Sequence, residues 1–249
     1  MTKQLRLLAN RYLSRETRRH LSRLAVWPPV GWVRFGQLRR TRPITTDYGN
    51  SRGLEIDRYY IEKFLSEHAN DIRGHVLEIK HNTYTTKFGR ERVTKSDVLH
   101  KVEGNPDATI VADLSKADHL PSNTFDTIIF TQTLQFIYDI KSTVATLYRI
   151  LKPGGIILAT AAGMAQISRQ DFEQWGEYWR FTSLSARYLF EEFFPKENVS
   201  VVSYGNVFSA ISFLEGLAVE DLKKKELDFT DPNYELIIAV CATKLDETS

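Results

Sequence analysis

Three acidic residues in the middle of the chain are the first feature whose type and spacing could carry chemistry. Glu78, Asp97 and Asp113 each stand at or near the end of a short apolar run, sixteen to nineteen residues apart. If the runs are parallel strands, these ends lie along one edge of a sheet, where ligands of open α/β folds bind. Carboxylates accept hydrogen bonds from hydroxyl and amino groups, attract cations and repel phosphate. The pattern predicts a site for a nucleoside that carries a positive charge.

The elements that must position these acids alternate between helical and strand-like patterns. Apolar residues at helical spacing predict helices, and short runs rich in β-branched and aromatic residues predict strands. The helices are expected at 56–68, 140–151 and 183–194, and the strands at 75–79, 92–97, 109–113, 125–131, 156–160, 199–204 and 235–243. This order predicts a doubly wound α/β fold with a seven-stranded, mostly parallel sheet. The last strand is expected to be antiparallel and to form an edge.

Composition limits the class of protein. The chain has 249 residues, of which 42% are hydrophobic and 26% are charged, so it can bury the core of one large domain with an appendage. The single cysteine, Cys241, excludes an intramolecular disulfide framework and a thiolate-clustered zinc site, and no His, Asp and Glu grouping has metal-ligand spacing. No uncharged window reaches the length of a bilayer span, and no secretory signal is visible. We expect a cytoplasmic location, at most peripheral to a membrane.

The net charge of +2 conceals a basic N-terminal part. Residues 1–46 hold eleven of the 33 Lys and Arg residues but one of the 31 acids. We expect residues 1–53 to form a basic helical extension and connector, and residues 54–249 to form the main domain. A basic amphipathic helix can pack on the acidic body or a neighbouring subunit, bind a membrane surface or a partner protein, or bind nucleic acid, which we consider the least favoured partner.

Two linked segments carry a resemblance to a known family. The sequence FDTII at 125–129, followed by LYRILKPGGI at 147–156, resembles the class I S-adenosylmethionine-dependent methyltransferases. The resemblance is to the type 11-like members associated with glycosyltransferases, and it extends over 56–244. In the second segment, Pro153 ends a helix and the glycines permit the positive φ needed to enter a strand.

The resemblance implies S-adenosyl-L-methionine as cofactor and assigns binding positions. Glu78 matches the acid of the first cofactor motif, Asp97 the residue that binds the ribose hydroxyls, and Asp113 a position beside the adenine. The full set of implied cofactor-binding residues is Tyr59, Tyr60, Glu78, Ile79, Lys80, Asp97, Val98, Asp113, Leu114, Thr131 and Gln132. The two tyrosines would cover the methionine end by cation–π contact, unless they are simply core residues.

The first loop departs from the family pattern. The family has Glu-x-Gly-x-Gly-x-Gly, but residues 78–84 read EIKHNTY and contain no glycine. Asn82 is a candidate for one left-handed position. Lys80 either neutralises the carboxylate of the cofactor or clashes with it. A non-catalytic relative that keeps the fold is therefore the main rival interpretation.

The segment 175–182, WGEYWRFT, is expected to cover the acceptor. Aromatic side chains stack on sugar rings, and the resemblance to glycosyltransferase-associated enzymes implies a sugar or glycan acceptor, so we assign Trp175, Tyr178, Trp179 and Arg180 to this side. His81 and His100 are weak candidates for the catalytic base. The prediction is methyl transfer, to oxygen, onto a small-molecule or glycan acceptor. The rival is a binding or scaffold protein recruited to a membrane or a glycosyltransferase by its basic N-terminus; a nicotinamide-dependent dehydrogenase is disfavoured by the missing glycine loop.

Overall fold

The structure is a computed structural model that describes residues 17, 34 and 36–246. The chain divides into two compact units, Met1–Arg42 and Pro43–Ser249. Of the first unit, one short helix is described, η1 (Gly36–Leu38). The predicted basic helix and its partners therefore lie outside the described residues.

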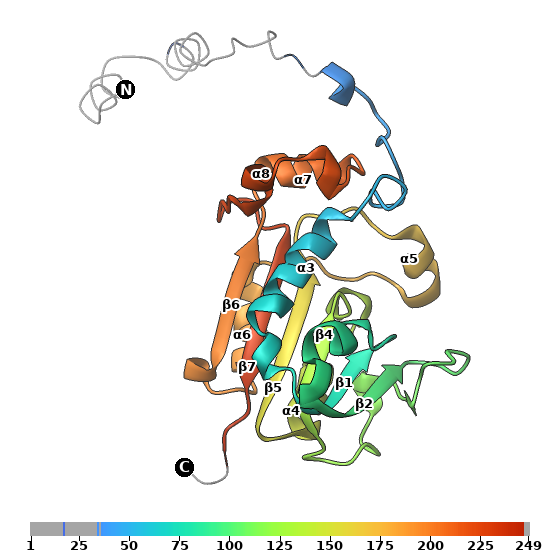
Figure 1. Ribbon diagram of the computed structural model, residues 1–249, viewed down its shortest axis with the longest axis vertical. Coiled ribbons are helices and arrows are strands. Elements are labelled where there is room, and N and C mark those ends of the chain that lie inside the picture. Colours follow the sequence, from blue (N-terminus) through green and yellow to red (C-terminus); the bar gives the residue numbers. More distant parts are fainter. Residues whose placement is uncertain (1–16, 18–33, 35, 247–249) are drawn as a thin grey trace, which may run out of the picture. The chain divides into compact units, whose positions relative to one another are not determined.

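The second unit is built on a seven-stranded sheet (Figure 1). Its strands are β1 (Gly74–Ile79), β2 (Val93–His100), β3 (Ile110–Val111), β4 (Phe125–Thr131), β5 (Leu151–Ala162), β6 (Val199–Tyr204) and β7 (Ile237–Thr243). The order across the sheet is β3-β2-β1-β4-β5-β7-β6. The pairs from β3 to β5 are parallel, and β7 is antiparallel to both of its neighbours. The predicted doubly wound α/β class is confirmed.

Helices cover both faces of this sheet. They are α3 (Ile56–Glu67), α4 (Ile140–Ile150), α5 (Arg169–Trp175), α6 (Ser183–Glu191), α7 (Val207–Leu214) and α8 (Lys224–Asp228). Successive strand residues point to opposite faces, so Ile128 joins a core with α4 and α6, whereas Ile129 joins a core with α3 and α7. The run IIF at 128–130 is therefore continuously apolar, because both faces of β4 are covered.

Two strand predictions need correction. β2 continues three residues past Asp97 and ends at His100, so Asp97 lies inside the strand rather than at its tip. β7 is antiparallel as expected, but it lies between β5 and β6, and β6 is the edge strand. β5 begins at Leu151 and passes through the Pro-Gly-Gly turn, where Gly154 has φ +70°, a value that disfavours any residue with a Cβ.

Residues 43–53, expected as a connector, are bonded to the main unit. The backbone N–H of Ile44 donates to the carbonyl of Glu215, and Thr45 Oγ1 donates to the carbonyl of Gly216 at 2.6 Å. Arg52 forms a bidentate ion pair with Asp221. The segment before α3 is thus fixed against the α7–α8 region, which in turn fixes where α3 begins.

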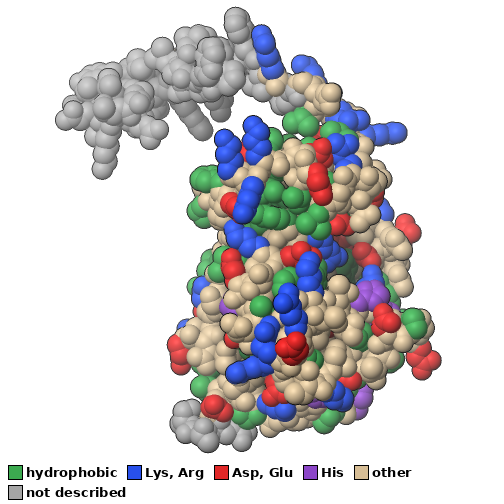
Figure 2. Space-filling model, viewed as in Figure 1, with side chains coloured by type: hydrophobic (Ala, Val, Ile, Leu, Met, Phe, Trp, Pro, Cys, Tyr) green, Lys and Arg blue, Asp and Glu red, His purple; other side chains and the backbone are tan. Residues whose placement is uncertain are grey.

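The surface over α7 and α8 combines apolar and basic side chains (Figure 2). Val207, Phe208, Ile211 and Leu214 of α7 are each more than 40% exposed, and three exposed lysines, at 223–225, follow in sequence. Among the described residues, no helix is both long and apolar enough to cross a membrane.

Candidate cofactor and acceptor site

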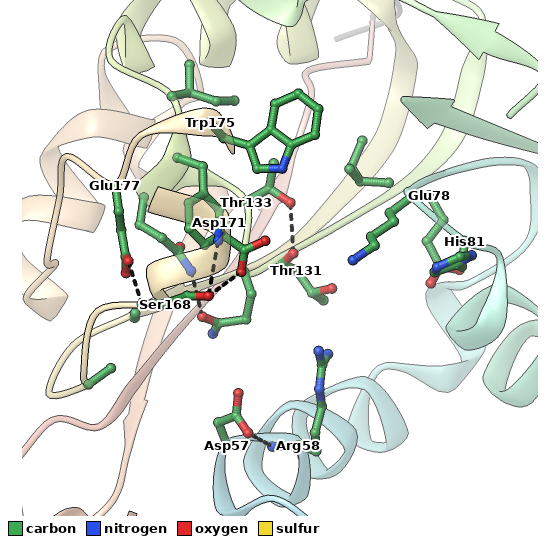
Figure 3. Close-up of a pocket in the computed structure, with 18 of the residues that line it drawn as sticks. Asp57, Arg58, Glu78, His81, Thr131, Thr133, Ser168, Asp171, Trp175 and Glu177 are labelled. Carbon is green, nitrogen blue, oxygen red and sulfur yellow. Dashed lines mark hydrogen bonds between the residues drawn. The ribbon is translucent and has the colours of Figure 1, made fainter. Parts of the chain in front are cut away.

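A cavity of about 750 Å³ opens at the carboxyl ends of the parallel strands. Its wall includes the loops after β1, β2, β3, β4 and β5, the first turn of α3 and the helix α5 (Figure 3). Such a crevice is the ligand site expected for an open α/β sheet, and its volume suits a small organic ligand.

Glu78, at the end of β1, is 3% exposed and acts as a cap for the next turn of chain. Its carboxylate accepts the backbone N–H groups of Tyr84 and Thr85, at 3.1 and 2.7 Å, and the hydroxyl of Thr85 at 2.7 Å. Burial raises the pKa of Glu78, and these hydrogen bonds oppose the rise. Glu78 lines the cavity as predicted, but it is occupied in holding the first loop.

The first loop keeps a backbone conformation typical of glycine without containing one. Lys80 has φ +73°, at the position of the family's first loop glycine, whereas Asn82 is not left-handed. The Lys80 N–H donates to the carbonyl of Leu99, and its own carbonyl accepts from Asn105 Nδ2 at 2.6 Å. These two bonds hold a strained residue in place, since the left-handed region costs an L-residue about 1–2 kcal/mol.

Asp97 does not reach the cavity. Its side chain is 11% exposed and is bound by His75 Nε2 at 2.6 Å, Lys95 Nζ at 2.9 Å and Thr109 Oγ1 at 2.8 Å. Asp97, the residue predicted to bind the ribose, is outside the cavity wall because β2 is longer than expected, and His100 and Lys101 lie at the strand tip instead.

Asp97 is therefore expected to contribute to stability and not to ligand affinity. Burial opposes its ionisation, but the bonds from His75, Lys95 and Thr109 outweigh it and hold the pKa of Asp97 below its usual value. A carboxyl with a lowered folded pKa stabilises the fold above its unfolded pKa of about 3.9, and this contribution disappears as the pH falls through the folded pKa. Asp97→Asn should lose about 1 kcal/mol of unfolding free energy at pH 7, and progressively less below about pH 4. Urea titrations over this pH range measure the effect; a constant deficit at every pH would contradict it.

The remaining cofactor predictions divide into two groups. Tyr59 and Tyr60 face away from the cavity: Tyr59 Oη donates to Asp228 and Tyr60 Oη to the carbonyl of Leu227. The two tyrosines therefore act as packing residues, which was the alternative to a cation–π contact with the cofactor. Val98 is buried and outside the cavity wall as well. Ile79, Lys80, Asp113, Leu114, Thr131 and Gln132 all line the cavity with Glu78.

Gln132 and Gln135, beside the tip of β4, form a strained and incompletely bonded pair. Gln132 has φ +48°, and Gln135 Nε2 donates to its Oε1 at 2.9 Å. Gln132 Nε2 and Gln135 Oε1 are buried without any partner. Of the five described non-glycine residues with positive φ, Tyr48, Lys80 and Gln132 line this cavity. Strain gathered at one cavity is typical of a functional site.

Both predicted histidines line the cavity. His100 Nδ1 lies 2.7 Å from the carbonyl oxygen of Val102, which can only accept, so Nδ1 is the donor in this bond and Nε2 is the ring nitrogen left for a ligand. The His100 ring also meets Trp175 edge to face at 5.7 Å. His81 Nδ1 bonds Asp107 at 2.9 Å, and its side chain is 53% exposed.

Of the four residues assigned to the acceptor side, one lines the cavity, Trp175; Glu177, from the same segment, lines it as well. Tyr178 and Trp179 lie outside it, packed with Tyr138 in an exposed aromatic cluster. Arg180 forms an ion pair with Glu177 at 2.7 Å, and Glu177 Oε2 accepts the Ser168 N–H at 2.9 Å. Arg180 thereby holds the loop before α5 in place rather than facing the cavity.

The sequence analysis missed two charged residues of the wall. Asp57 and Arg58 lie in the first turn of α3 and both line the cavity. Burial raises the pKa of Asp57, and the neighbouring Arg58 charge opposes the rise. The available signal was a pair of adjacent, opposite charges at the start of the helix before the first strand. The cofactor contacts of this helix were assigned instead to the two tyrosines that follow the pair.

Comparison with known proteins agrees with this architecture. Residues 61–159 match the family model described as a methyltransferase domain. A demethylmenaquinone methyltransferase from Listeria monocytogenes is 33% identical over 82 residues, which are 33% of this chain and 32% of that protein. The matched segment thus spans about a third of that relative.

Two solved structures share the fold at low sequence identity. A putative sarcosine dimethylglycine methyltransferase from Galdieria sulphuraria has a TM-score of 0.52 at 12% identity, covering 76% of this chain and 86% of that one. A SAM-dependent methyltransferase from Archaeoglobus fulgidus has a TM-score of 0.50 at 12% identity, covering 75% and 94%. The main unit has the class I S-adenosylmethionine-dependent methyltransferase fold. Its central segment, 61–159, is the part that matches the methyltransferase domain model.

Proposed function

We propose that the protein binds S-adenosyl-L-methionine in the cavity and transfers its methyl group to a hydroxyl of a sugar or glycan intermediate. Cofactor binding is supported above all by the position of the cavity at the tips of β1 to β4. These four strands belong to the segment 61–159 that matches a methyltransferase domain. The sugar acceptor is supported by Trp175 in the cavity wall and by the exposed aromatic cluster of Tyr138, Tyr178 and Trp179, the last two of which follow Trp175 closely in the chain.

The residues of the wall fit such a cofactor. Asp113 follows β3 and caps η5 (Leu114–Lys116) through the N–H and hydroxyl of Ser115, which leaves its Oδ2, 3.3 Å from Lys101 Nζ, for an amino donor such as adenine. The tip of β2 offers His100 and Lys101 where an acid was expected, so any ribose contact there comes from different groups. The mixture of carboxylates and cations suits a ligand that carries both charges.

The chemistry that the cofactor supplies is a methyl group on a positively charged sulfur. The protein's part is to align the acceptor oxygen with that methyl group and to accept one proton. In this proposal His100 Nε2 receives the proton that the hydroxyl loses, since Nδ1 is bonded to the Val102 carbonyl and the ring is held edge to face by Trp175. The products are a methyl ether and S-adenosylhomocysteine.

A second function is favoured by one observation, the Lys80 side chain in the first loop. If this cation blocks the cofactor, the unit is a non-catalytic binding or scaffold protein. Its partner, a membrane surface or another protein, would then be reached through the basic N-terminal segment.

The experiment that separates these functions is calorimetric titration of the full chain with S-adenosylhomocysteine. We expect micromolar affinity, unchanged in Asp97→Asn and weakened about tenfold in Asp113→Asn, the equivalent of about 1.4 kcal/mol for one lost hydrogen bond to a charged group. The two variants are matched, since each removes one carboxylate charge from a neighbouring strand region. No binding by folded wild-type protein would overturn the proposal and favour the scaffold.

A further inference from the structure

Most carboxylates in the cavity wall already have a side-chain partner. Their bonds, each between 2.6 and 2.8 Å, occupy them within the protein. The pairs are Glu55 with Asn50, Glu62 with Lys87, Glu78 with Thr85, Asp113 with Ser115, Asp171 with Ser168 and Glu177 with Arg180. A ligand at any of these groups must therefore share the carboxylate with a side chain of the protein.

Asp57 is the exception among the described carboxylates of the wall. Its Oδ1 accepts only the backbone N–H of Arg58 at 2.8 Å, and no described side chain donates to Oδ2. The residue stands in the concave wall rather than on the outer surface. A carboxylate so placed gains more from an incoming cation than an exposed one would, because a partly dry cavity screens charges weakly.

Arg58 supplies the complementary charge. One of its terminal nitrogens donates to Tyr84 Oη at 2.9 Å, and the other N–H groups of its fork have no described partner. Although Asp57 and Arg58 are adjacent, no ion pair of 4.0 Å or less joins their side chains within the described part of the chain. Figure 3 shows both side chains extending from α3 toward the cavity with their charged ends apart.

Two opposite charges that face one cavity without forming an ion pair with each other are complementary to a ligand group that carries one positive and one negative charge. An α-amino acid end has an ammonium for Asp57 and a carboxylate for the fork of Arg58. Tyr84, which positions Arg58, is also the residue whose N–H is bound by Glu78. Arg58 therefore stands over the first loop, where the glycines of the family pattern are missing.

We infer that Asp57 and Arg58 form a clamp for the zwitterionic amino acid end of the ligand, so that α3 supplies the contacts for which this chain lacks a glycine loop. The inference rests on the proposed function, because the ligand that brings such a group here is the cofactor.

The test compares S-adenosylhomocysteine with 5′-methylthioadenosine, which lacks the amino acid end, by calorimetry on the full chain. Wild-type protein should bind S-adenosylhomocysteine at least tenfold more tightly. Asp57→Asn and Arg58→Met should each reduce this ratio about tenfold while leaving the affinity for 5′-methylthioadenosine unchanged. Lys63→Met is the matched control, since Lys63 lies on the same helix but bonds Asp228 outside the cavity.

A third ligand separates the two charges. S-adenosyl-3-thiopropylamine keeps the ammonium but lacks the carboxylate, so its affinity should fall in Asp57→Asn and stay constant in Arg58→Met. Thermal unfolding of each variant checks folding, and Arg58→Lys, which keeps the charge without the fork, should recover part of the discrimination. Tight S-adenosylhomocysteine binding with an unaltered ratio in both variants overturns the clamp alone. Failure of wild-type protein to bind any of the three ligands overturns the proposed function and the clamp with it.

Discussion

Glu78→Ala should lower the free energy of unfolding by about 3 kcal/mol, the largest single-residue loss of stability that we expect in the site. The substitution removes the acceptor of two buried backbone N–H groups and one hydroxyl. Each hydrogen bond to an ionised group contributes about 1.5–3 kcal/mol, and relief of the buried charge offsets part of the sum. Urea denaturation of the full chain at pH 7 measures the loss.

Glu78→Gln is the control that separates hydrogen bonding from charge. Its amide oxygen can still accept from the Thr85 N–H, so the loss should be about 1 kcal/mol. Equal losses in the two variants would mean that the charge, and not the bonding of the loop, is what the fold requires. A loss below 1 kcal/mol for Glu78→Ala would show that the loop does not depend on this cap.

The fold was predictable because its signals are local. The run FDTII and the turn LKPGG mark a buried strand, a helix end and a strand start. The strand and the helix end occur where they were expected, whereas β5 begins at Leu151, five residues before its expected start. Strand length was less predictable. The polar Asp97 was expected to end β2, but tertiary partners such as His75 and Thr109 satisfy its carboxylate inside the sheet. A polar residue ends a strand only if nothing across the sheet can bond it.

The site was predicted in part, for a related reason. Residues at strand tips, such as Asp113 and Thr131, line the cavity because the topology alone puts them there. Residues that reach it from α3 depend on which face of the helix is buried. Tyr59 and Tyr60 bond residues of α8, so the helix turns Asp57 and Arg58 toward the cavity. The packing of α7 and α8 against α3 therefore determines which α3 residues line the site.

Lys80→Gly should both stabilise the protein and strengthen cofactor binding, and this outcome would resolve the role of the missing glycines. At φ +73° a glycine avoids the Cβ conflict, while it adds flexibility to the unfolded chain; the net gain should be about 1 kcal/mol. Because Arg58 is expected to bind the carboxylate of the ligand, the Lys80 charge is dispensable. Removing its side chain from the cavity should tighten S-adenosylhomocysteine binding about tenfold, or about 1.4 kcal/mol.

Lys80→Ala divides the two effects, since alanine removes the side chain but keeps the Cβ at the same backbone angle. It should gain the affinity without gaining the stability, so that the difference in unfolding free energy between the Gly and Ala variants, about 1 kcal/mol, reports the backbone strain alone. Calorimetry and urea denaturation on the same samples give both numbers. A loss of affinity in both variants would instead assign the carboxylate to Lys80, and the strained backbone would then be the means by which the loop presents that cation to the ligand.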